Sequence, residues 1–345
     1  MKAYFLDGAR TLVKRETDRP MIRPSDVLLK VHSVGICGSD IEYYVHNRCG
    51  AFVPRGPLVL GHELSGEVVE KGAEVTGLAC GTRVAIDPSI PCGSCEYCRA
   101  GRHNLCDRMR FIGTAASFPP ISGGMGEFVA VPAVNCHLIP EHISWGEATC
   151  LEPLSVAVHA TLRAGSLAGA SVFISGGGII GQSVALTARA LGAAAIAVSD
   201  IQPFRRAFAV EHGADYAIDP RNADEIARAQ EASGGFDFLF ESSGATTAVR
   251  DSLIIVKKGA TIVQIGTVPS EVTLMANLVM VNELRVLGSF RYGDVFPISM
   301  SLLASRRVDV RPLISVTLPY ARSKEAFELA SERSNTIKVQ IQVGG

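Results

Sequence analysis

The segment SVFISGGGIIG, Ser171 to Gly181, decides the fold of the second half of the chain. A short apolar run leads into Gly176, Gly178 and Gly181, which form the pattern Gly-x-Gly-x-x-Gly. A helical pattern follows through residues 185–191. Backbone N–H groups at the start of such a helix can hold a pyrophosphate. The segment therefore predicts a dinucleotide site, with Ile180 beside the glycines, although a glycine turn that binds nothing remains an alternative.

Asp200 ends the next apolar strand, about 20 residues beyond Gly181. A carboxylate there accepts hydrogen bonds from a ribose 2′-hydroxyl and repels a 2′-phosphate, which favours NAD over NADP. Arg205 and Arg206 lie close enough in sequence to leave NADP open. Arg205 can instead stack on the adenine.

The remaining patterns predict two domains. In the second half, apolar strands at 171–175, 195–200, 236–241, 260–266 and 284–290 alternate with helical patterns that include 204–213 and 246–259. This alternation indicates an α/β domain with a doubly wound parallel sheet of the Rossmann type. Alternating stretches at 27–34, 64–70, 82–87 and 126–132 indicate a β-rich first domain, to which the tail adds a helix at 323–333 and a strand at 337–343. We expect one domain of residues 1–152 with 291–345, and another of residues 153–290.

Composition excludes several classes of protein. The chain has 345 residues, of which 47% are hydrophobic and 19% charged, and its net charge is −1, so no basic field points to nucleic acid or an anionic membrane. Asp7 and Arg10 interrupt any signal peptide. The uncharged stretch 165–188 is too rich in glycine for a membrane span. Nine cysteines, an odd number, favour a reducing cytoplasm.

The segment PCGSCEYCRAGRHNLC, residues 91–106, clusters four of these cysteines. Cys92, Cys95, Cys98 and Cys106 follow the spacing x2, x2 and x7. An iron–sulfur cluster would more often show x3 before a fourth cysteine followed by proline. A four-thiolate zinc site is the better fit, and because it leaves zinc no open position it would be structural.

Three further segments contain other metal-ligating residues. GICGSD contains Cys37, Ser39 and Asp40, GHELSGEVVEKG contains His62 and Glu63, and CLEPLSVAVHA contains Glu152. Taken singly, each residue has a structural interpretation: a buried thiol, a hydrogen-bonded core histidine or an acid at a helix start.

Together these motifs resemble the zinc-dependent medium-chain dehydrogenase/reductases over essentially the whole chain. GHE followed by Gly66, Gly72 and Val75 matches the zinc signature of that family. The resemblance implies a GroES-like catalytic domain beside a Rossmann domain, and two zinc ions per subunit. It implies that Cys37 and His62 bind a catalytic zinc, with Glu63 and Glu152 both candidate ligands. Ser39 would pass a proton outward, Asp40 would orient His62, and a homotetramer or homodimer is expected.

The same resemblance narrows the substrate. Glu152 within EPLSV resembles the polyol dehydrogenase branch, where Tyr43 and the segment GSFRYGD would contact substrate. The residues implied at the substrate are Tyr43, Arg291 and Tyr292, and those implied at the cofactor are Ile265, Gly266, Thr267, Ser289, Phe290 and Arg291. MRFIGTAASFPPISGG, residues 109–124, resembles L-idonate 5-dehydrogenases, which interconvert L-idonate and 5-keto-D-gluconate. An aldonate carboxylate suits a guanidinium, for which Arg110 and Arg291 are candidates, and Arg48 a weaker one.

Some alternatives stay open. Glu42 replaces a histidine common in sorbitol dehydrogenases, yet a neutral polyol such as sorbitol, xylitol or galactitol remains the second hypothesis. L-Threonine dehydrogenases are a more distant match. A non-catalytic NAD-binding protein and a nucleic-acid-binding zinc ribbon are hypotheses of other classes. Cys49, Cys80, Cys136 and Cys150 have no predicted role beyond packing.

Overall fold

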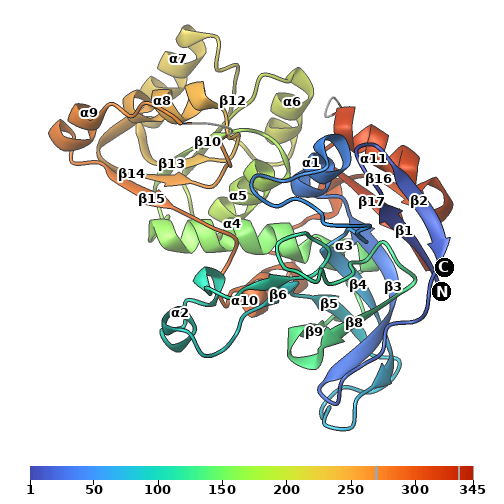
Figure 1. Ribbon diagram of the computed structural model, residues 1–345. Coiled ribbons are helices and arrows are strands. Elements are labelled where there is room, and N and C mark those ends of the chain that lie inside the picture. Colours follow the sequence, from blue (N-terminus) through green and yellow to red (C-terminus); the bar gives the residue numbers. More distant parts are fainter. Residues whose placement is uncertain (269–270, 333–334, 345) are drawn as a thin grey trace. The chain divides into compact units, whose positions relative to one another are not determined.

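The computed structural model describes residues 1–268, 271–332 and 335–344. It divides into two compact units, whose elements are labelled in Figure 1. The first unit contains Met1–Glu152 and the chain from Ile314 onward, and the second contains Pro153–Leu313. The sequence predicts one domain of residues 1–152 with 291–345 and another of residues 153–290, and the second unit extends further along the chain, to Leu313.

Contacts of α10 (Phe296–Ala304) explain this later boundary. Ser299 of α10 accepts a buried hydrogen bond from Ser155 of α4 (Leu151–Ala164), with 3.0 Å between the hydroxyl oxygens. The backbone N–H of Gly293 donates to Nδ1 of His159, on the same helix, at 3.4 Å. The segment before and within α10 is therefore anchored to the second unit.

A seven-stranded sheet organises the first unit, in the order β16-β17-β3-β4-β5-β9 with β8 paired to β3. Its strands are β3 (Asp26–Gly35), β4 (Glu63–Lys71), β5 (Arg83–Ile86), β8 (Phe128–Pro132), β9 (Cys136–Leu138), β16 (Ile314–Pro319) and β17 (Lys338–Gln342). A hairpin pairs β1 (Lys2–Leu6) with β2 (Leu12–Glu16), and a separate two-stranded sheet pairs β6 (Ser89–Ile90) with β7 (Arg110–Phe111). The strands predicted in this unit correspond to β3, β4, β5, β8 and β17, so its β-rich character is confirmed.

Short helices connect these strands. They are α1 (Gly38–His46), α2 (Glu96–Arg99), α3 (Trp145–Thr149) and α11 (Ser323–Glu332). Helix α11 corresponds to the helix predicted at 323–333, whose last residue lies outside the described residues.

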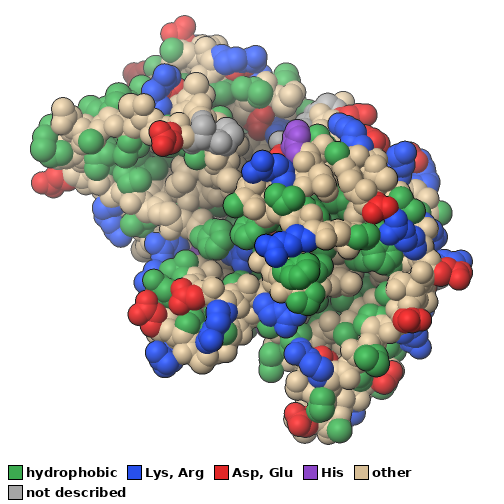
Figure 2. Space-filling model, in the orientation of Figure 1, with side chains coloured by type: hydrophobic (Ala, Val, Ile, Leu, Met, Phe, Trp, Pro, Cys, Tyr) green, Lys and Arg blue, Asp and Glu red, His purple; other side chains and the backbone are tan. Residues whose placement is uncertain are grey.

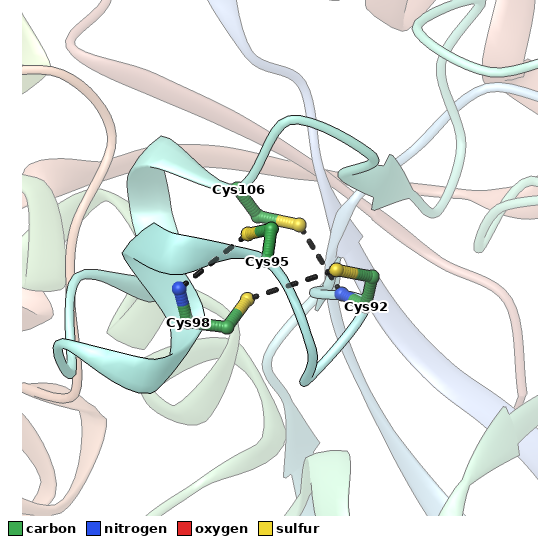
Figure 3. A group of neighbouring side chains, drawn as sticks. All are labelled: Cys92, Cys95, Cys98 and Cys106. Atoms are coloured by element: carbon green, nitrogen blue, oxygen red, sulfur yellow. Dashed lines mark hydrogen bonds between the residues drawn. The ribbon is translucent and has the colours of Figure 1, made fainter.

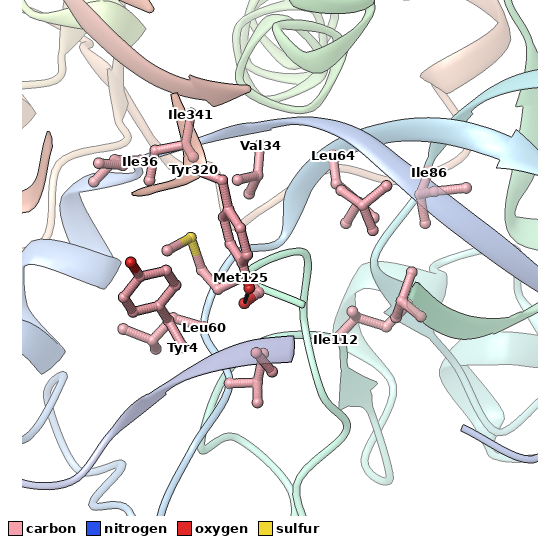
Figure 4. Close-up of a cluster of buried hydrophobic side chains, with 14 of the residues drawn as sticks. Tyr4, Val34, Ile36, Leu60, Leu64, Ile86, Ile112, Met125, Tyr320 and Ile341 are labelled. Atoms are coloured by element: carbon pink, nitrogen blue, oxygen red, sulfur yellow. Dashed lines mark hydrogen bonds between the residues drawn. The ribbon is translucent and has the colours of Figure 1, made fainter. Parts of the chain in front are cut away.

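The hydrophobic core holds the two chain segments of this unit together (Figure 4). Tyr4 of β1 and Tyr320, which follows β16, meet edge to face with ring centroids 5.0 Å apart. The Tyr320 hydroxyl donates to the carbonyl oxygen of Met125 at 2.8 Å. Val34 of β3 and Ile341 of β17 belong to the same buried cluster. Because burying each large apolar side chain stabilises by about 1.5–3 kcal/mol, the C-terminal segment stays in the first unit despite its distance in sequence.

The second unit is a six-stranded parallel sheet in the order β12-β11-β10-β13-β14-β15. Its strands are β10 (Ser171–Ser175), β11 (Ala195–Ser199), β12 (Tyr216–Ile218), β13 (Phe236–Glu241), β14 (Val256–Gln264) and β15 (Arg285–Gly288). Besides α4 and α10, its helices are α5 (Ile179–Ala190), α6 (Pro203–Glu211), α7 (Ala223–Ser233), α8 (Thr246–Ile255) and α9 (Ala276–Val281). Strand order reverses between β10 and β13, which is the doubly wound topology the sequence predicts.

Alternate strand residues of this sheet enter two separate cores. Val172 and Ile174 of β10 pack with α4 and α5 on one face. Phe173 of the same strand packs with residues of α7 and α8 on the other face (Figure 1). Because both faces are covered, the strands are apolar throughout, as parallel strands usually are.

Two predicted boundaries differ from the structure. The helix predicted at 246–259 ends at Ile255, because Val256 already pairs with Phe236 in the sheet. The last strand, predicted at 284–290, is limited to Arg285–Gly288. The uncharged stretch 165–188 forms β10 and most of α5, and the described residues contain no helix with the length and apolar character needed to span a membrane.

The glycine turn generates a prediction about stability. A Cβ at Gly181 would lie 1.8 Å from the carbonyl oxygen of Gly176, whereas a Cβ at Gly178 would meet nothing closer than 3.9 Å. We expect Gly181→Ala to lower the free energy of unfolding by about 3 kcal/mol and Gly178→Ala to change it by less than about 1 kcal/mol. Urea unfolding followed by circular dichroism measures both, and equal losses would contradict this packing.

Candidate functional site

A thiol, an imidazole and a carboxylate meet where β3 ends and β4 begins. Gly35 and Glu63 are partners in the antiparallel pairing of these strands, and Cys37 and His62 are their near neighbours in sequence. One ligand atom from each of Cys37, His62 and Glu63 lies within 4.8 Å of the others. Sulfur, nitrogen and oxygen donors of this kind are the ligands that zinc takes in proteins, and three of them leave a fourth position open.

Glu63 is held in this group by an ion pair with Lys338 of β17. The Lys338 ammonium donates to the two carboxylate oxygens at 2.7 and 2.8 Å and to the carbonyl oxygen of Ile36 at 3.0 Å. Both side chains are about 1% exposed. A Cβ on Gly35 would lie 2.1 Å from Oε2 of Glu63, so glycine is needed there to leave room for the carboxylate. Sequence analysis missed Lys338, although a lysine within the apolar strand IKVQIQV was a visible signal.

Asp40 lies between Cys37 and His62. One Asp40 oxygen accepts from the Cys37 backbone N–H at 3.0 Å, and the other lies 3.6 Å from Nδ1 of His62. That oxygen and Nδ1 are both buried without a hydrogen-bond partner. Burial lowers the pKa of His62, but the charges of Asp40 and Cys37 outweigh it and hold that pKa well above its ordinary value. The negative groups that favour a proton on the imidazole would also favour a metal cation bound to it instead of that proton.

Glu152 lies beside the group of Cys37, His62 and Glu63 but is not one of these three converging donors. Its pKa is raised to about 7, chiefly by burial, with the charge of His62 acting against the rise and the charge of Glu63 adding to it. Ser39, on the first turn of α1, is half-buried. The structure therefore brings Cys37, His62 and Glu63 together, with Glu152 and Ser39 nearby.

The substrate candidates in this unit differ in their surroundings. The buried Tyr43 hydroxyl accepts from the Ala115 backbone N–H at 3.2 Å, and burial raises the pKa of Tyr43 to about 12. The charges of Asp40 and His62 also shift the pKa of Tyr43, so Tyr43 lies near the group of Cys37, His62 and Glu63. Arg110 is exposed on β7.

The four clustered cysteines converge on one point (Figure 3). The sulfurs of Cys92 and Cys98 are 4.0 Å apart, and the backbone N–H groups of Cys92 and Cys98 donate to the sulfurs of Cys106 and Cys95 at 3.2 and 3.5 Å. Tetrahedral zinc with Zn–S of about 2.3 Å spaces its sulfurs about 3.8 Å apart, which fits. A four-iron cluster would bind each thiolate at a different iron and hold the sulfurs farther apart.

The electrostatics of the cluster also require a cation. Backbone Ser94 N–H and the Arg108 guanidinium, 3.4 Å from the sulfur, lower the pKa of Cys92 to about 5. Burial, as the largest cause, and the neighbouring thiols together raise the pKa of Cys98 to about 12. A positive ion beside the four sulfurs would favour the thiolate form of Cys98 against this burial. The cluster is a structural zinc site, and Arg108 is a contact that sequence analysis did not predict.

The predicted cofactor residues follow one edge of the second unit's sheet. Ser199, Ser175, Glu241, Gln264 and Gly288 form one row across the strand ends. Beyond this row come the glycine turn, Asp200, Ile265 to Thr267, and Ser289 to Arg291. The carboxyl edge of a doubly wound sheet, at the point where strand order reverses, is where dinucleotides bind.

The glycine turn fits a pyrophosphate. Gly176 has a φ of +94°, which favours glycine, and the start of α5 approaches Gly176 so closely that only glycine fits at Gly181. Asp200 accepts from the backbone N–H groups of Gly177 and Gln202, each at 2.8 Å. The Arg205 guanidinium lies 3.5 Å from Asp200. Asp200 therefore both shapes the turn and presents a carboxylate beside it.

The segment 289–292 lies within the second unit, just before α10. Ser289 and Tyr292 are buried, whereas Phe290 is exposed. The Arg291 guanidinium stacks on the Phe290 ring, 5.0 Å from its centroid, and the Arg291 backbone has a φ of +51°. The Tyr292 ring packs on Phe296 with centroids 5.5 Å apart.

Comparisons with known proteins match both halves of the chain. Residues 23–141 match the family model of the alcohol dehydrogenase GroES-like domain, and residues 180–305 match that of zinc-binding dehydrogenases. Sorbitol dehydrogenase of Gallus gallus is 38% identical over 323 residues, which cover 92% of this chain and 90% of that protein. D-Xylulose reductase A of Aspergillus oryzae is 36% identical over 333 residues, covering 94% and 92%.

Solved structures of similar fold are also known. L-Idonate 5-dehydrogenase from Escherichia coli matches with a TM-score of 0.91 and 32% identity, covering 99% of this chain and 98% of that one. Together with the family models, this match confirms the predicted fold class, a GroES-like domain with a Rossmann domain.

The ion pair at Glu63 generates a prediction. Lys338→Met would leave a buried carboxylate without its partner, and we expect metal-free protein to lose about 3–5 kcal/mol of unfolding free energy. Zinc should restore part of this loss, because a cation beside Glu63 replaces the ammonium. The measurement is urea unfolding of chelated and zinc-loaded protein.

Lys257→Met is the matched control. Lys257 pairs with Asp237 at 2.8 Å, but both side chains are more than a third exposed. We expect this control substitution to lower the free energy of unfolding by less than about 1 kcal/mol, with or without zinc. If Lys338→Met costs no more than Lys257→Met, the buried pair does not hold the site.

Proposed function

The chain belongs to the zinc-dependent medium-chain alcohol dehydrogenase family, and we propose that it oxidises a secondary alcohol of a sugar acid or polyol with NAD. The leading reaction is the oxidation of L-idonate to 5-keto-D-gluconate. The observation that carries the proposal is the buried group of Cys37, His62 and Glu63, a donor set suited to zinc with one position left for substrate.

The roles of the residues follow from their chemistry. Zinc, when bound, supplies a Lewis acid that favours ionisation of an alcohol and so prepares its α-hydrogen to leave as hydride. Cys37, His62 and Glu63 hold the ion, and Glu152 borders it as an alternative ligand. Asp40 fixes the ring of His62, and Ser39 receives the released proton and passes it outward.

The second unit carries the cofactor in this proposal. The glycine turn with Ile180 binds the pyrophosphate, and Asp200 accepts hydrogen bonds from the adenosine ribose, which favours NAD over NADP. Arg205 covers the adenine side. The nicotinamide half of the cofactor is contacted by Ile265 to Thr267 and Ser289 to Arg291.

Two similarities point to different alcohols. The likeness to an L-idonate 5-dehydrogenase structure supports an acid substrate, with Arg110 or Arg291 binding its carboxylate. The likeness to a sorbitol dehydrogenase supports a neutral polyol such as sorbitol, xylitol or galactitol, contacted by Tyr43 and Tyr292. We favour the acid because the residues 109–124 resemble aldonate enzymes.

We also propose that the enzyme is a cytoplasmic homodimer or homotetramer. Reduced cysteines at both zinc sites suit a reducing compartment. The hydrophobic side chains of α9 gather at the left of Figure 2, and Met280 and Val281 are 67% and 59% exposed. The neighbouring β15 is an edge strand, and its exposed Val286 adds to a surface suited to a second copy.

The first functional prediction concerns substrate and cofactor choice. We expect zinc-loaded protein to reduce NAD with L-idonate faster than with D-gluconate, sorbitol or xylitol, and faster with NAD than with NADP. Absorbance of the reduced cofactor measures each rate. A preference for a neutral polyol would replace the aldonate assignment with the second one, and turnover of none of these alcohols would contradict the proposal.

A second prediction assigns the carboxylate contact. We expect Arg291→Ala to raise the KM for L-idonate at least tenfold while raising that for a neutral polyol less than about threefold, since a charged bidentate contact contributes about 1.5–3 kcal/mol. Arg291→Lys should recover part of the loss, and Arg110→Ala is the comparison variant. Equal losses for acid and polyol would exclude a carboxylate role for Arg291.

A further inference from the structure

Glu241 is a buried acid to which the sequence assigned no role. It ends β13, the strand after the reversal of strand order, and lies in register between Ser175 of β10 and Gln264 of β14. It is 0% exposed. Its carboxylate is therefore at the centre of the sheet edge that carries the predicted cofactor residues.

The groups that contact this carboxylate donate hydrogen bonds to it. The backbone N–H groups of Ser243 and Gly244 lie 2.9 and 3.1 Å from Oε1, and the amide of Gln264 lies 2.7 Å from Oε2. The Ser243 hydroxyl accepts from Ala245 N–H at 3.1 Å, so its own hydrogen is directed at Glu241. The carboxylate therefore accepts each of these hydrogen bonds, which is the pattern of a group that carries no proton to donate.

These donors are all neutral. Within the described ranges, no lysine, arginine or histidine forms an ion pair with Glu241. Dipoles of N–H groups make the ionised form tolerable but leave one full negative charge inside the fold. A buried charge without a counter-charge is costly, and a cationic ligand at this edge would offset that cost.

Glu241 also connects the turns on either side of it. The Gln264 amide donates both to Glu241 and to the carbonyl oxygen of Gly266, the latter at 2.6 Å. A Cβ on Gly266 would lie 2.4 Å from the backbone nitrogen of Gly244 and 2.8 Å from Oε2 of Glu241. The turn 242–244 and the turn 265–267 are thus in backbone contact, with the charge directly beneath Gly266.

The topology indicates which half of a dinucleotide would lie here. Asp200 follows β11, on one side of the glycine turn, and suits the adenosine half. The other half must then extend in the opposite direction, over the ends of β13 and β14. A nicotinamide ring is a cation when oxidised and neutral when reduced.

We propose that Glu241 discriminates between the two redox states of the cofactor, binding oxidised dinucleotide more tightly than reduced. The proposal rests on the function proposed above and adds a specificity-determining residue to it. Oxidation of the alcohol would move a hydride, one hydrogen with two electrons, from its carbon to a bound nicotinamide ring, and would release the hydroxyl proton by way of Ser39. The ring would then be neutral and would no longer be attracted to Glu241. The reduced cofactor is then the more easily released.

The test is to measure dissociation constants of NAD⁺ and NADH by calorimetry on the zinc-loaded full chain. We expect Glu241→Gln to raise the ratio Kd(NAD⁺)/Kd(NADH) about tenfold, the size expected for opposite charges several ångströms apart in a partly screened site. Glu241→Asp keeps the charge and should keep the ratio, even where shortening the side chain weakens both affinities.

Gln264→Leu is the matched control, because it removes a neutral link between the same two turns. It should weaken both cofactors by the same factor. If Glu241→Gln weakened the binding of NAD⁺ and of NADH by the same factor, Glu241 would have only a structural role. That result would overturn the inference while leaving the proposed function intact. Wild-type protein that binds neither dinucleotide would overturn the proposed function and this inference together.

Discussion

The buried ion pair between Glu63 and Lys338 is the interaction on which the candidate metal centre depends. It joins β4 to β17, two strands far apart in sequence that flank β3 in the sheet. Without the ammonium, the carboxylate would not remain in a buried site beside a thiol and an imidazole. With it, three donors of different chemistry are held together before any ion arrives, which is the preorganisation a metal centre needs.

The two units separate two tasks. The first holds two cation sites of different kinds: a four-thiolate site without an open position, and a mixed site with one. The second presents backbone N–H groups, the carboxylate of Asp200 proposed to bind ribose, and the buried carboxylate of Glu241 along a single sheet edge. Both units use glycine for the same reason, since Gly35 and Gly181 each stand where a Cβ would collide with the group that does the chemistry or shapes its site.

Local patterns predicted what depends on local spacing. The glycine turn, the four-cysteine cluster and the apolar strands follow from neighbouring residues, and the structure contains all of them. Lys338 and Glu241 were missed because their importance comes from strand neighbours that sequence spacing does not reveal. The end of α8 was predicted too late because sheet pairing of Val256 overrode a continuous apolar pattern.

The central claim is that this chain holds two zinc ions with different ligands. X-ray absorption at the zinc edge, combined with metal analysis, tests it on the purified protein. The account predicts two zinc ions per chain, with sulfur at about 2.3 Å and lighter nitrogen and oxygen atoms at about 2.0–2.2 Å among their nearest neighbours. One zinc ion per chain surrounded by sulfur alone, in protein given excess zinc, would mean that Cys37, His62 and Glu63 form no metal centre.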